Sequence, residues 1–429
     1  MGLQNKKGSR NQIRRKTETR RPIPAAQQFR KERLPNKPKT TTRRKNKKSI
    51  HHNEKRKKIH RNIPQHTKRT NITKIMYRNM EPERTTRKIV PRGSSEKRLF
   101  GEKLSRYVAK MFEERGRKAL GIARKVMAEE TAKLDCEEAR EALKYFMNDY
   151  WSETTRPALL SVVCEALGGN PDVTTPIAVP LILISGAVDI HDDLIDQSKM
   201  KRNHPTLYGK FGKDIALLVG DALLFKGFSL LHEASRELQP EKVHTVFELI
   251  RKSFFELGDA EALELALKTR RRIKIEEYME LVKKKAADFE AYMRISVILA
   301  DGSKEEIEAL GRYGRILGML VILGDDNADT LDSFELMNRI KNEVLPLPLI
   351  YALYKPSLRK KIIPILQKKK LTKKDAETIL DIVYRANIFE KIEKHFRELI
   401  AEAKNNIKAI KNKDLLIQIL ESTYPKNGF

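Results

Sequence analysis

The sequence predicts an all-α fold for most of its length, and three observations support that prediction. Apolar residues recur at three- and four-residue steps from about Leu99 nearly to the C-terminus, which is the spacing of one helix face. The alternation of apolar and polar residues that indicates strands is lacking there. Gly and Pro fall mostly between the periodic segments, where they end helices. These features favour one domain of about ten or more packed helices.

Charge divides the 429 residues into two parts. Residues 1–100 hold 33 of the 87 Lys and Arg but only six of the 57 Asp and Glu, so the remainder carries 54 and 51 and is nearly neutral. Few large apolar residues occur in the basic part, and such a segment cannot bury enough surface to offset its ordering entropy. We therefore predict a disordered basic tail over residues 1–98 and an all-α domain over residues 99–429.

The role of the basic tail has several interpretations. It is either a solvated tail without a specific role, or a segment attracted to RNA, DNA or anionic lipid by its charge. A third interpretation is that the true start is Met76 or Met80. The near-neutral remainder excludes a reading of the whole protein as a basic nucleic-acid binder.

Helical periodicity starts in the first apolar segments of the domain, where Leu104, Val108 and Met111 share one helix face. Gly168 to Pro171 mark a break between helices. The longest apolar stretch, residues 176–188, is too short to span a bilayer, so we expect a buried helix and no transmembrane segment.

Cysteine usage indicates the compartment. Cys136 and Cys164 cannot form a disulfide framework and lack metal-ligand spacing. The N-terminus has no apolar run of the kind found in secretory signals. A reducing intracellular setting is the simplest interpretation, and we expect a cytoplasmic location.

Two aspartate clusters carry the main functional signal. Asp192 and Asp193 are followed by Asp196, and the same spacing recurs in Asp325, Asp326 and Asp329. Carboxylates four residues apart lie on one helix face, one turn apart, where like charges oppose helix formation unless a cation binds them. Each cluster ends an apolar stretch, so the two can face each other across a bundle. Oxygen ligands and bridging to phosphate make Mg²⁺ the natural candidate.

The sequence resembles the trans-isoprenyl diphosphate synthases, the polyprenyl synthetase family, closely over about residues 145–355. The resemblance implies an isoprenoid-synthase-type helical bundle. The residues that carry it, besides the two aspartate clusters, are Arg156-Pro157, Gly168-Gly169, His191, Lys201-Arg202, Pro205-Thr206, Phe211-Gly212, Gly220-Asp221-Ala222-Leu223-Leu224, Lys285 and Gly318.

The resemblance implies a Mg²⁺-dependent prenyltransferase that condenses an allylic diphosphate with isopentenyl diphosphate into a longer trans-polyprenyl diphosphate. Lys201 and Lys285 are the catalytic residues it implies, since they hold the diphosphate that leaves. The implied metal ligands are Asp192, Asp196 and Asp325, supported by Asp193, Asp326 and Asp329. The implied substrate-binding residues are Arg156, Lys201, Arg202 and Lys285, with Arg339 or Lys341 supplying a further charge.

Product length in the family depends on the pocket wall before the first aspartate cluster. Ala187 and Val188 are small or modest in size where short-chain enzymes often carry an aromatic floor, and Ile184 lies deeper. These residues favour a product of about C20 or longer, unless another helix supplies the floor.

Several positions depart from the family pattern. Glu153 stands where the family has a lysine that binds isopentenyl diphosphate, and Ser185 stands where it has His or Gln. Ala286 and Ile322 replace a Thr and a Gln. A carboxylate beside a diphosphate is repulsive by about 1 kcal/mol in water and more when buried.

Three readings therefore stay open. The first is a divergent prenyltransferase. The second is a partner subunit of a heteromeric prenyl diphosphate synthase that turns over poorly alone. The third is a class I terpenoid enzyme that ionises a prenyl diphosphate without using isopentenyl diphosphate. By resemblance, we expect a homodimer or a heteromer with another prenyl synthase chain.

The basic tail generates a first prediction. Deleting residues 1–95 should leave the melting temperature and catalytic constants of the remaining domain almost unchanged, because the tail has too few apolar residues to pack and its charge is screened beyond about 8 Å at physiological salt. The same deletion should abolish any salt-sensitive binding to RNA or anionic vesicles. A large drop in melting temperature would show that the tail is part of the fold.

Overall fold

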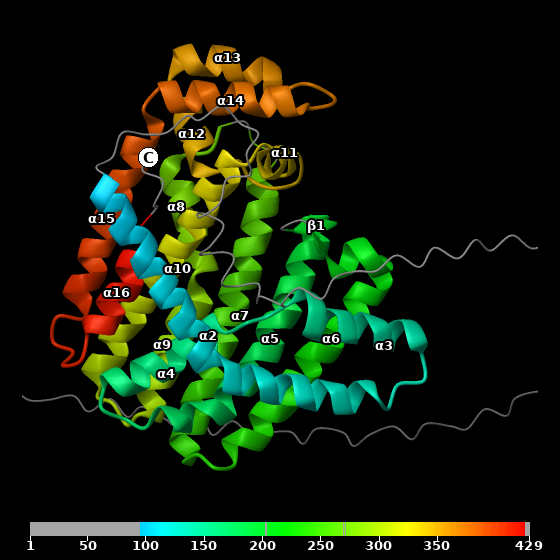
Figure 1. Ribbon diagram of the computed structural model, residues 1–429, viewed down its shortest axis with the longest axis vertical. Coiled ribbons are helices and arrows are strands. Elements are labelled where there is room, and N and C mark those ends of the chain that lie inside the picture. Colours follow the sequence, from blue (N-terminus) through cyan, green and yellow to red (C-terminus); the bar gives the residue numbers. More distant parts are fainter. Residues whose placement is uncertain (1–94, 202–203, 269, 271, 425–429) are drawn as a thin grey trace, which may run out of the picture. The chain divides into compact units, whose positions relative to one another are not determined.

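The computed structural model describes residues 95–201, 204–268, 270 and 272–424. The chain divides into one unit of residues 1–65 and a second of residues 66–429, and every described residue belongs to the second. Apart from one short hairpin, the described secondary structure is helical (Figure 1). The all-α prediction is therefore confirmed. The predicted tail lies outside the described residues, except that the first described helix already begins at Ser95.

The first half of the domain surrounds one long apolar helix, α5, which packs most extensively along α6 and also contacts α2 and α4. A π-helical segment, Tyr145–Tyr150, links α3 to the loop before α4, and a short 3₁₀ turn, Pro171–Thr174, leads into α5. The helices are α2 (Ser95–Thr131), α3 (Glu137–Lys144), α4 (Thr155–Ala166), α5 (Thr175–Ile195), α6 (Leu207–Ser235) and α7 (Pro240–Lys268).

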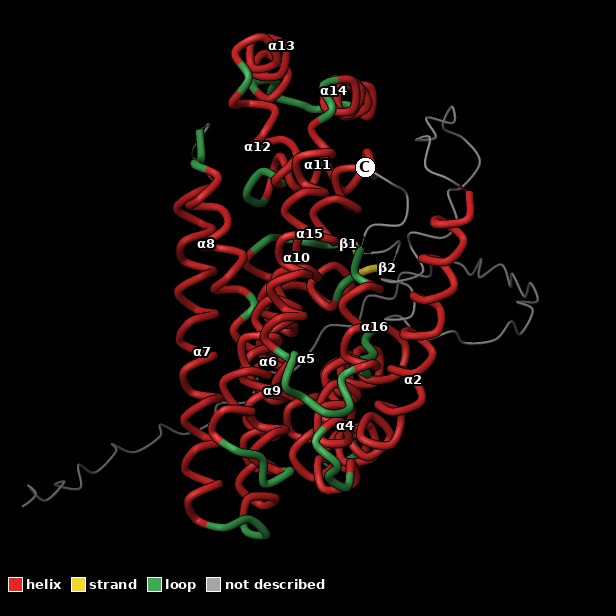
Figure 2. Tube along the Cα trace, turned by 90° about the vertical axis from the view of Figure 1, so that its left-hand side faces the viewer, coloured by secondary structure: helices red, strands yellow, loops and turns green. Residues whose placement is uncertain are grey.

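The second half is built around α9 and α10, which pack against each other and connect to α4, α7 and α15. Figure 2 views α13 and α14 end-on while α7 and α8 run vertically, so the α13–α14 pair crosses the direction of the longer helices. The helices are α8 (Ile275–Lys285), α9 (Ala287–Leu299), α10 (Lys304–Leu331), α11 (Ser333–Asn342), α12 (Leu347–Tyr354), α13 (Pro356–Leu366), α14 (Lys373–Arg385), α15 (Ile388–Asn406) and α16 (Asp414–Ser422).

Close approach of helix backbones fixes α5 against α6. A side chain at Gly227 would place its Cβ 2.6 Å from Cγ1 of Ile184, and one at Gly220 would lie 2.6 Å from Nε2 of His191. Only glycine leaves room at both contacts, because packed interiors have few voids that could absorb a methyl group. The C-terminal turns of α5, which carry the first aspartate cluster, are therefore held rigidly against α6.

Local capping signals determine where the site-bearing helices begin. Ser303 and Glu306 form a capping box at the start of α10. Asp332 ends α10 and at the same time caps α11, since its carboxylate accepts the backbone N–H of Phe334 at 2.9 Å. A single residue therefore joins α10 to α11, and α11 must turn back beside the end of α10.

Two segments of the described part of the chain are long and apolar enough to cross a membrane by length and composition. The first, residues 171–195, contains α5, and 72% of its most apolar stretch is buried inside the protein, as expected of a core helix. The second is α6, of which only 33% of the corresponding stretch is buried. Burial in the core of this chain therefore does not account for the apolar surface of α6.

Candidate functional site

Both aspartate clusters lie at the C-terminal ends of buried helices. Asp192 and Asp193 are in the last turn of α5, with Asp196 immediately after it, and Asp325, Asp326 and Asp329 are in the last two turns of α10. The C-terminus of a helix carries partial negative charge, which disfavours carboxylates by about 0.3–1 kcal/mol each. These clusters are therefore stable only if cations from other elements lie close to them.

The hairpin after α5 supplies the cation for the first cluster. Strands β1 (Met200–Lys201) and β2 (His204–Pro205) pair in antiparallel register and place Lys201 over the end of α5. Its Nζ lies 2.6 Å from Oδ1 of Asp193 and 3.3 Å from Oδ2 of Asp192. Burial raises the pKa of Asp193 to about 6 in spite of Lys201. Burial acts the same way on Asp192, but Lys201 and Lys285 outweigh it and hold its pKa below the usual range.

The carboxylate of Asp196 has no hydrogen-bond or ion-pair partner among the residues that the structure describes. Burial, followed by the charges of Asp192, Glu343 and Glu264, raises the pKa of Asp196 to about 8. Glu343 follows α11 and Glu264 lies on α7, so residues from distant parts of the sequence act on one carboxylate. The two aspartate clusters therefore share one electrostatic environment.

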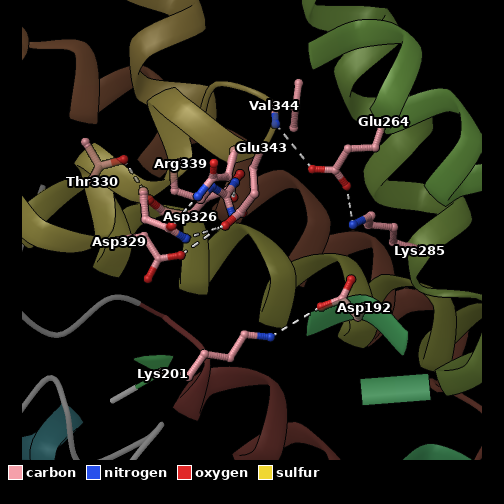
Figure 3. A network of polar contacts seen from close by, with 12 residues as sticks. Asp192, Lys201, Glu264, Lys285, Asp326, Asp329, Thr330, Arg339, Glu343 and Val344 are labelled. Carbon is pink, nitrogen blue, oxygen red and sulfur yellow. Dashed lines mark hydrogen bonds and ion pairs between the residues drawn. The ribbon is translucent and has the colours of Figure 1, made fainter. Parts of the chain in front are cut away.

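Arg339, on α11, supplies the cation for the second cluster (Figure 3). Its guanidinium pairs closely with the buried carboxylate of Asp326, lies 3.6 Å from Asp329 and lies 3.2 Å from Glu343. The Tyr278 hydroxyl also donates to Asp326. Burial raises the pKa of Asp329 to about 7, although Arg339 opposes that shift.

Lys285, at the end of α8, reaches the site from a third direction. Its ammonium pairs with Glu264 and lies 3.0 Å from Glu261, both on α7. Glu264 is held in turn by the backbone N–H of Val344 at 3.4 Å, as Figure 3 shows. Burial by itself would lower the pKa of Lys285, but Glu264 and Asp192 raise it well above its usual value.

A cavity with about 430 Å³ of empty space, counting its opening to solvent, runs along α5 on the side of the first cluster. Its wall includes Val188, Ile184 and Leu181 at successive turns of α5, faced by Phe254 of α7 and Tyr292 of α9. Two of the three residues predicted for the chain-length pocket, Ile184 and Val188, therefore line a cavity. Ala187 is fully buried and is absent from the lining.

Arg156 lies on the same cavity, and its guanidinium is already occupied. Nη1 donates to Glu153 at 2.6 Å, while Nε and Nη2 donate to one oxygen of Asp288 at 2.9 and 2.7 Å. The Glu153 carboxylate also accepts the backbone N–H of Arg156 at 3.0 Å and is only 4% exposed. We call these three residues the Arg156 clamp. It uses three of the five guanidinium N–H groups that could otherwise bind an oxyanion.

The remaining predicted residues differ in position. Arg202 lies outside the described residues. Lys341 is exposed on α11, and within the described part of the chain it has no ion pair with the site. Ser185 shares a hydrogen bond of 2.8 Å with Tyr292 across the cavity. Ala286 ends α8 beside Lys285, and Ile322 is half-buried on α10.

Sequence reasoning missed four acidic residues of the site and the clamp: Glu261, Glu264, Asp288 and Glu343. One signal was available, because Glu261 and Glu264 are three apart and share a helix face. Glu343 likewise follows Arg339 by four residues and pairs with it. Nothing in the local sequence around Asp288 indicates its pairing with Arg156, which lies 132 positions earlier.

The side chains at the two clusters can be tested against a divalent metal. Around the site nine carboxyl groups stand against three basic side chains: Asp192, Asp193, Asp196, Glu261, Glu264, Asp325, Asp326, Asp329 and Glu343 against Lys201, Lys285 and Arg339. Within the described residues, no group of three or more His, Cys, Asp or Glu is already arranged to hold a metal ion. Mg²⁺ commonly uses one or two carboxylates together with substrate phosphates, so Asp196, which has no partner among the described residues, fits it together with Asp192.

The site defines a class of protein before any relative is considered: a helical bundle with two aspartate clusters beside an apolar cavity. The sequence profile of the polyprenyl synthetase family matches residues 137–383, and the chain belongs to that family.

Named relatives agree with the assignment to the polyprenyl synthetase family. The chain is 31% identical over 210 residues to the geranylgeranyl diphosphate synthase of Methanosarcina mazei, covering 49% of this chain and 64% of the relative. It is 31% identical over 186 residues to a short chain isoprenyl diphosphate synthase of Methanothermobacter thermautotrophicus, covering 43% and 56%. The matched segments thus span less than two thirds of these relatives.

Solved structures share the isoprenoid-synthase fold. Geranylgeranyl pyrophosphate synthetase from Pyrococcus horikoshii superposes with a TM-score of 0.63 at 24% identity, over 73% of this chain and 96% of that one. A polyprenyl synthase from Caulobacter crescentus, solved in complex with calcium and isoprenyl diphosphate, gives 0.62 at 18% identity, over 75% and 97%. Identities this low support the fold, and the predicted bundle type is confirmed.

Proposed function

We propose that the protein is a prenyltransferase that ionises an allylic diphosphate and transfers the prenyl group to isopentenyl diphosphate, giving a longer trans-polyprenyl diphosphate. One observation carries this proposal. The two aspartate clusters share the cations Lys201, Lys285 and Arg339, and Asp192 lies one helical turn beyond Val188 and Asp189, which line the cavity along α5. The names of the relatives, which are prenyl diphosphate synthases, support the same reaction class.

In the proposed reaction, the C–O bond of the allylic diphosphate breaks and leaves diphosphate and an allylic cation. The double bond of isopentenyl diphosphate attacks the cation, and a proton then passes to the departing diphosphate. Bound Mg²⁺, held by Asp192, Asp196 and Asp325, would neutralise charge on the leaving group. Lys201 and Lys285 would bind the diphosphate by exchanging carboxylate partners for its oxygens.

The cavity would hold the prenyl chain and exclude water from the cation. On α5 its lining residues are Leu181, Ile184, Ser185, Val188 and Asp189, none of them aromatic, which supports a product of about C20 or longer. Phe254 and Tyr292 come from neighbouring helices, so the floor of the pocket is shared between α5, α7 and α9. Bulk at Phe254 would then limit product length as much as any residue of α5.

The Arg156 clamp favours a second candidate function. Arg156 pairs with both Glu153 and Asp288, so the place expected for isopentenyl diphosphate carries two carboxylates and one cation. A chain with that charge balance suits a partner subunit of a heteromeric synthase, or a class I terpenoid enzyme that needs no isopentenyl diphosphate. Product analysis with Mg²⁺, isopentenyl diphosphate and C5 to C20 allylic primers separates these candidates from the first.

We also propose that the protein forms a homodimer, or a heteromer with another prenyl synthase chain, in the cytoplasm. Helix α6 is strongly apolar but largely unburied, and it exposes 63% of Leu218 and 77% of Phe225. Its neighbour α7, which it contacts through Phe228 and Phe254, exposes Phe255. A contiguous apolar face of this kind is typical of an interface between chains.

The metal assignment generates a prediction on activity. Asp192→Ala and Asp325→Ala should each lower Mg²⁺-dependent turnover by roughly 100-fold or more, because each removes a ligand and charge stabilisation of the leaving diphosphate. Asp381→Ala, which removes an exposed carboxylate paired with Arg385 on α14, is the matched control and should leave turnover unchanged. Both site variants should keep the wild-type circular dichroism spectrum. Unaltered turnover at saturating Mg²⁺ in either would remove the assignment.

The clamp generates a prediction on the acceptor. Glu153→Gln should lower the KM for isopentenyl diphosphate about tenfold, equivalent to about 1.4 kcal/mol, because it removes a repulsive charge and frees part of the Arg156 guanidinium. The KM for the allylic diphosphate should change little. Glu165→Gln, which removes an exposed carboxylate from the same helix, is the control.

An unchanged or higher KM for isopentenyl diphosphate in Glu153→Gln would mean that the clamp does not face that substrate. Product formation only after addition of another prenyl synthase chain would instead give the partner-subunit function first place.

The exposed face of α6 generates a prediction on assembly. Phe225→Glu combined with Leu218→Glu should convert the assembly to monomers in sedimentation velocity, because burying two carboxylates in an apolar interface costs several kcal/mol. Phe334→Glu alters an equally exposed phenylalanine on α11 and should leave the sedimentation coefficient unchanged. A wild-type protein that already sediments as a monomer would refute the interface.

A further inference from the structure

The second aspartate cluster already contains a cation that belongs to the chain. The Arg339 guanidinium contacts Asp326, Asp329 and Glu343, which come from two separate segments. Asp326 is 1% exposed, and its second oxygen accepts the Tyr278 hydroxyl. Each oxygen of this buried carboxylate therefore already has a protein partner.

Chain connectivity makes the arrangement persistent. Because Asp332 both ends α10 and caps α11, the second turn of α11 lies beside the last turns of α10, where Asp326 and Asp329 project. Asp326 is tied down further on its own helix, since its backbone carbonyl accepts the Thr330 hydroxyl at 2.7 Å. The Arg339 side chain is only 14% exposed and thus has little freedom to leave.

The first cluster shares part of this pattern, since Asp193 is 4% exposed and its oxygens contact Lys201 at 2.6 Å and the Tyr150 hydroxyl at 3.5 Å, but its cation and Asp196 differ. Lys201, its cation, has a side chain that is 41% exposed and comes from a two-residue strand. Asp196 has no ion-pair partner in the described part of the chain. The first cluster, whose cation is more exposed, can therefore admit a metal ion, whereas Asp326 and Asp329 already contact a buried cation of the chain.

We propose that Arg339 takes the place of one divalent ion at the second aspartate cluster, so that metal binds through the first cluster and Asp325 but not through Asp326 or Asp329. This inference rests on the proposed binding of a diphosphate at the site. A guanidinium can bridge carboxylates and phosphate oxygens with permanent positive charge and planar, directional donors. The buried Nε of Arg339 has no acceptor among the described residues, so one N–H remains for an additional oxygen ligand.

Metal counting tests the inference without any need for turnover. The number of Mn²⁺ ions bound per chain is measured by equilibrium dialysis and electron paramagnetic resonance, with inorganic pyrophosphate as the anion. Arg339→Gln should bind one ion more than the wild type, because Asp326, Asp329 and Glu343 lose their cation. Arg339→Lys keeps the charge and should bind the wild-type number.

Arg294→Gln is the matched control. Arg294 is also 14% exposed and pairs with two carboxylates, Glu290 and Glu308, but lies outside the site. Its variant should bind the wild-type number of ions and should report the general cost of losing a buried arginine in a thermal melt. Equal ion counts in the wild type and Arg339→Gln would overturn the inference.

A second pair of variants keeps the test decisive if Arg339→Gln does not fold. Asp326→Asn should leave the ion count unchanged, whereas Asp196→Asn should lower the count or weaken Mn²⁺ binding at least tenfold. A lower count in Asp326→Asn would contradict the inference. If the wild type binds no Mn²⁺ with pyrophosphate, the proposed function fails together with the inference; if it binds metal without transferring prenyl groups, only the proposed function fails.

Discussion

The placement of carboxylates at two helix C-termini is the constraint on which the rest of the site depends. The ends of α5 and α10 are already negative, and each carries three aspartates. An unpaired buried charge costs several kcal/mol. Cations must therefore reach this place from elsewhere, and three do so from separate elements: Lys201 from β1, Lys285 from α8 and Arg339 from α11. The elements β1, α8 and α11 therefore lie around the ends of α5 and α10, where their cations balance the carboxylates.

The periodic spacing of apolar residues and the two aspartate clusters made the fold class and the centre of the site predictable from sequence. Each of these signals lies within one helix, where spacing alone determines which side chains share a face. The clamp was not predictable in the same way. Glu153 was recognised as a departure and lies only three residues before Arg156, but the contribution of Asp288 depends on how α4 packs against α9. Contacts between distant segments leave no periodic trace in a single sequence.

The aspartate clusters and the Arg156 clamp differ in how their charge is balanced. At the aspartate clusters the acidic groups include Asp196, which has no protein partner within the described residues, so an added cation is favoured. At the Arg156 clamp, by contrast, the guanidinium already pairs with two carboxylates of the chain. The aspartate clusters therefore favour a diphosphate accompanied by metal, whereas the clamp offers no excess positive charge to a further anion.

The balance at the clamp therefore decides between the candidate functions. A diphosphate that binds Arg156 must share its charge with Glu153 and Asp288 or displace one of them, and both are tethered to the same framework, so they compete at a high effective concentration. Although burial would lower it, Asp288 and Glu153 raise the pKa of Arg156 well above its usual value, which reflects how tightly they hold the charge. Isopentenyl diphosphate can overcome this competition only if its second phosphate gains contacts elsewhere. A chain that binds its acceptor here consequently needs either a cation from the partner subunit or an acceptor without a diphosphate.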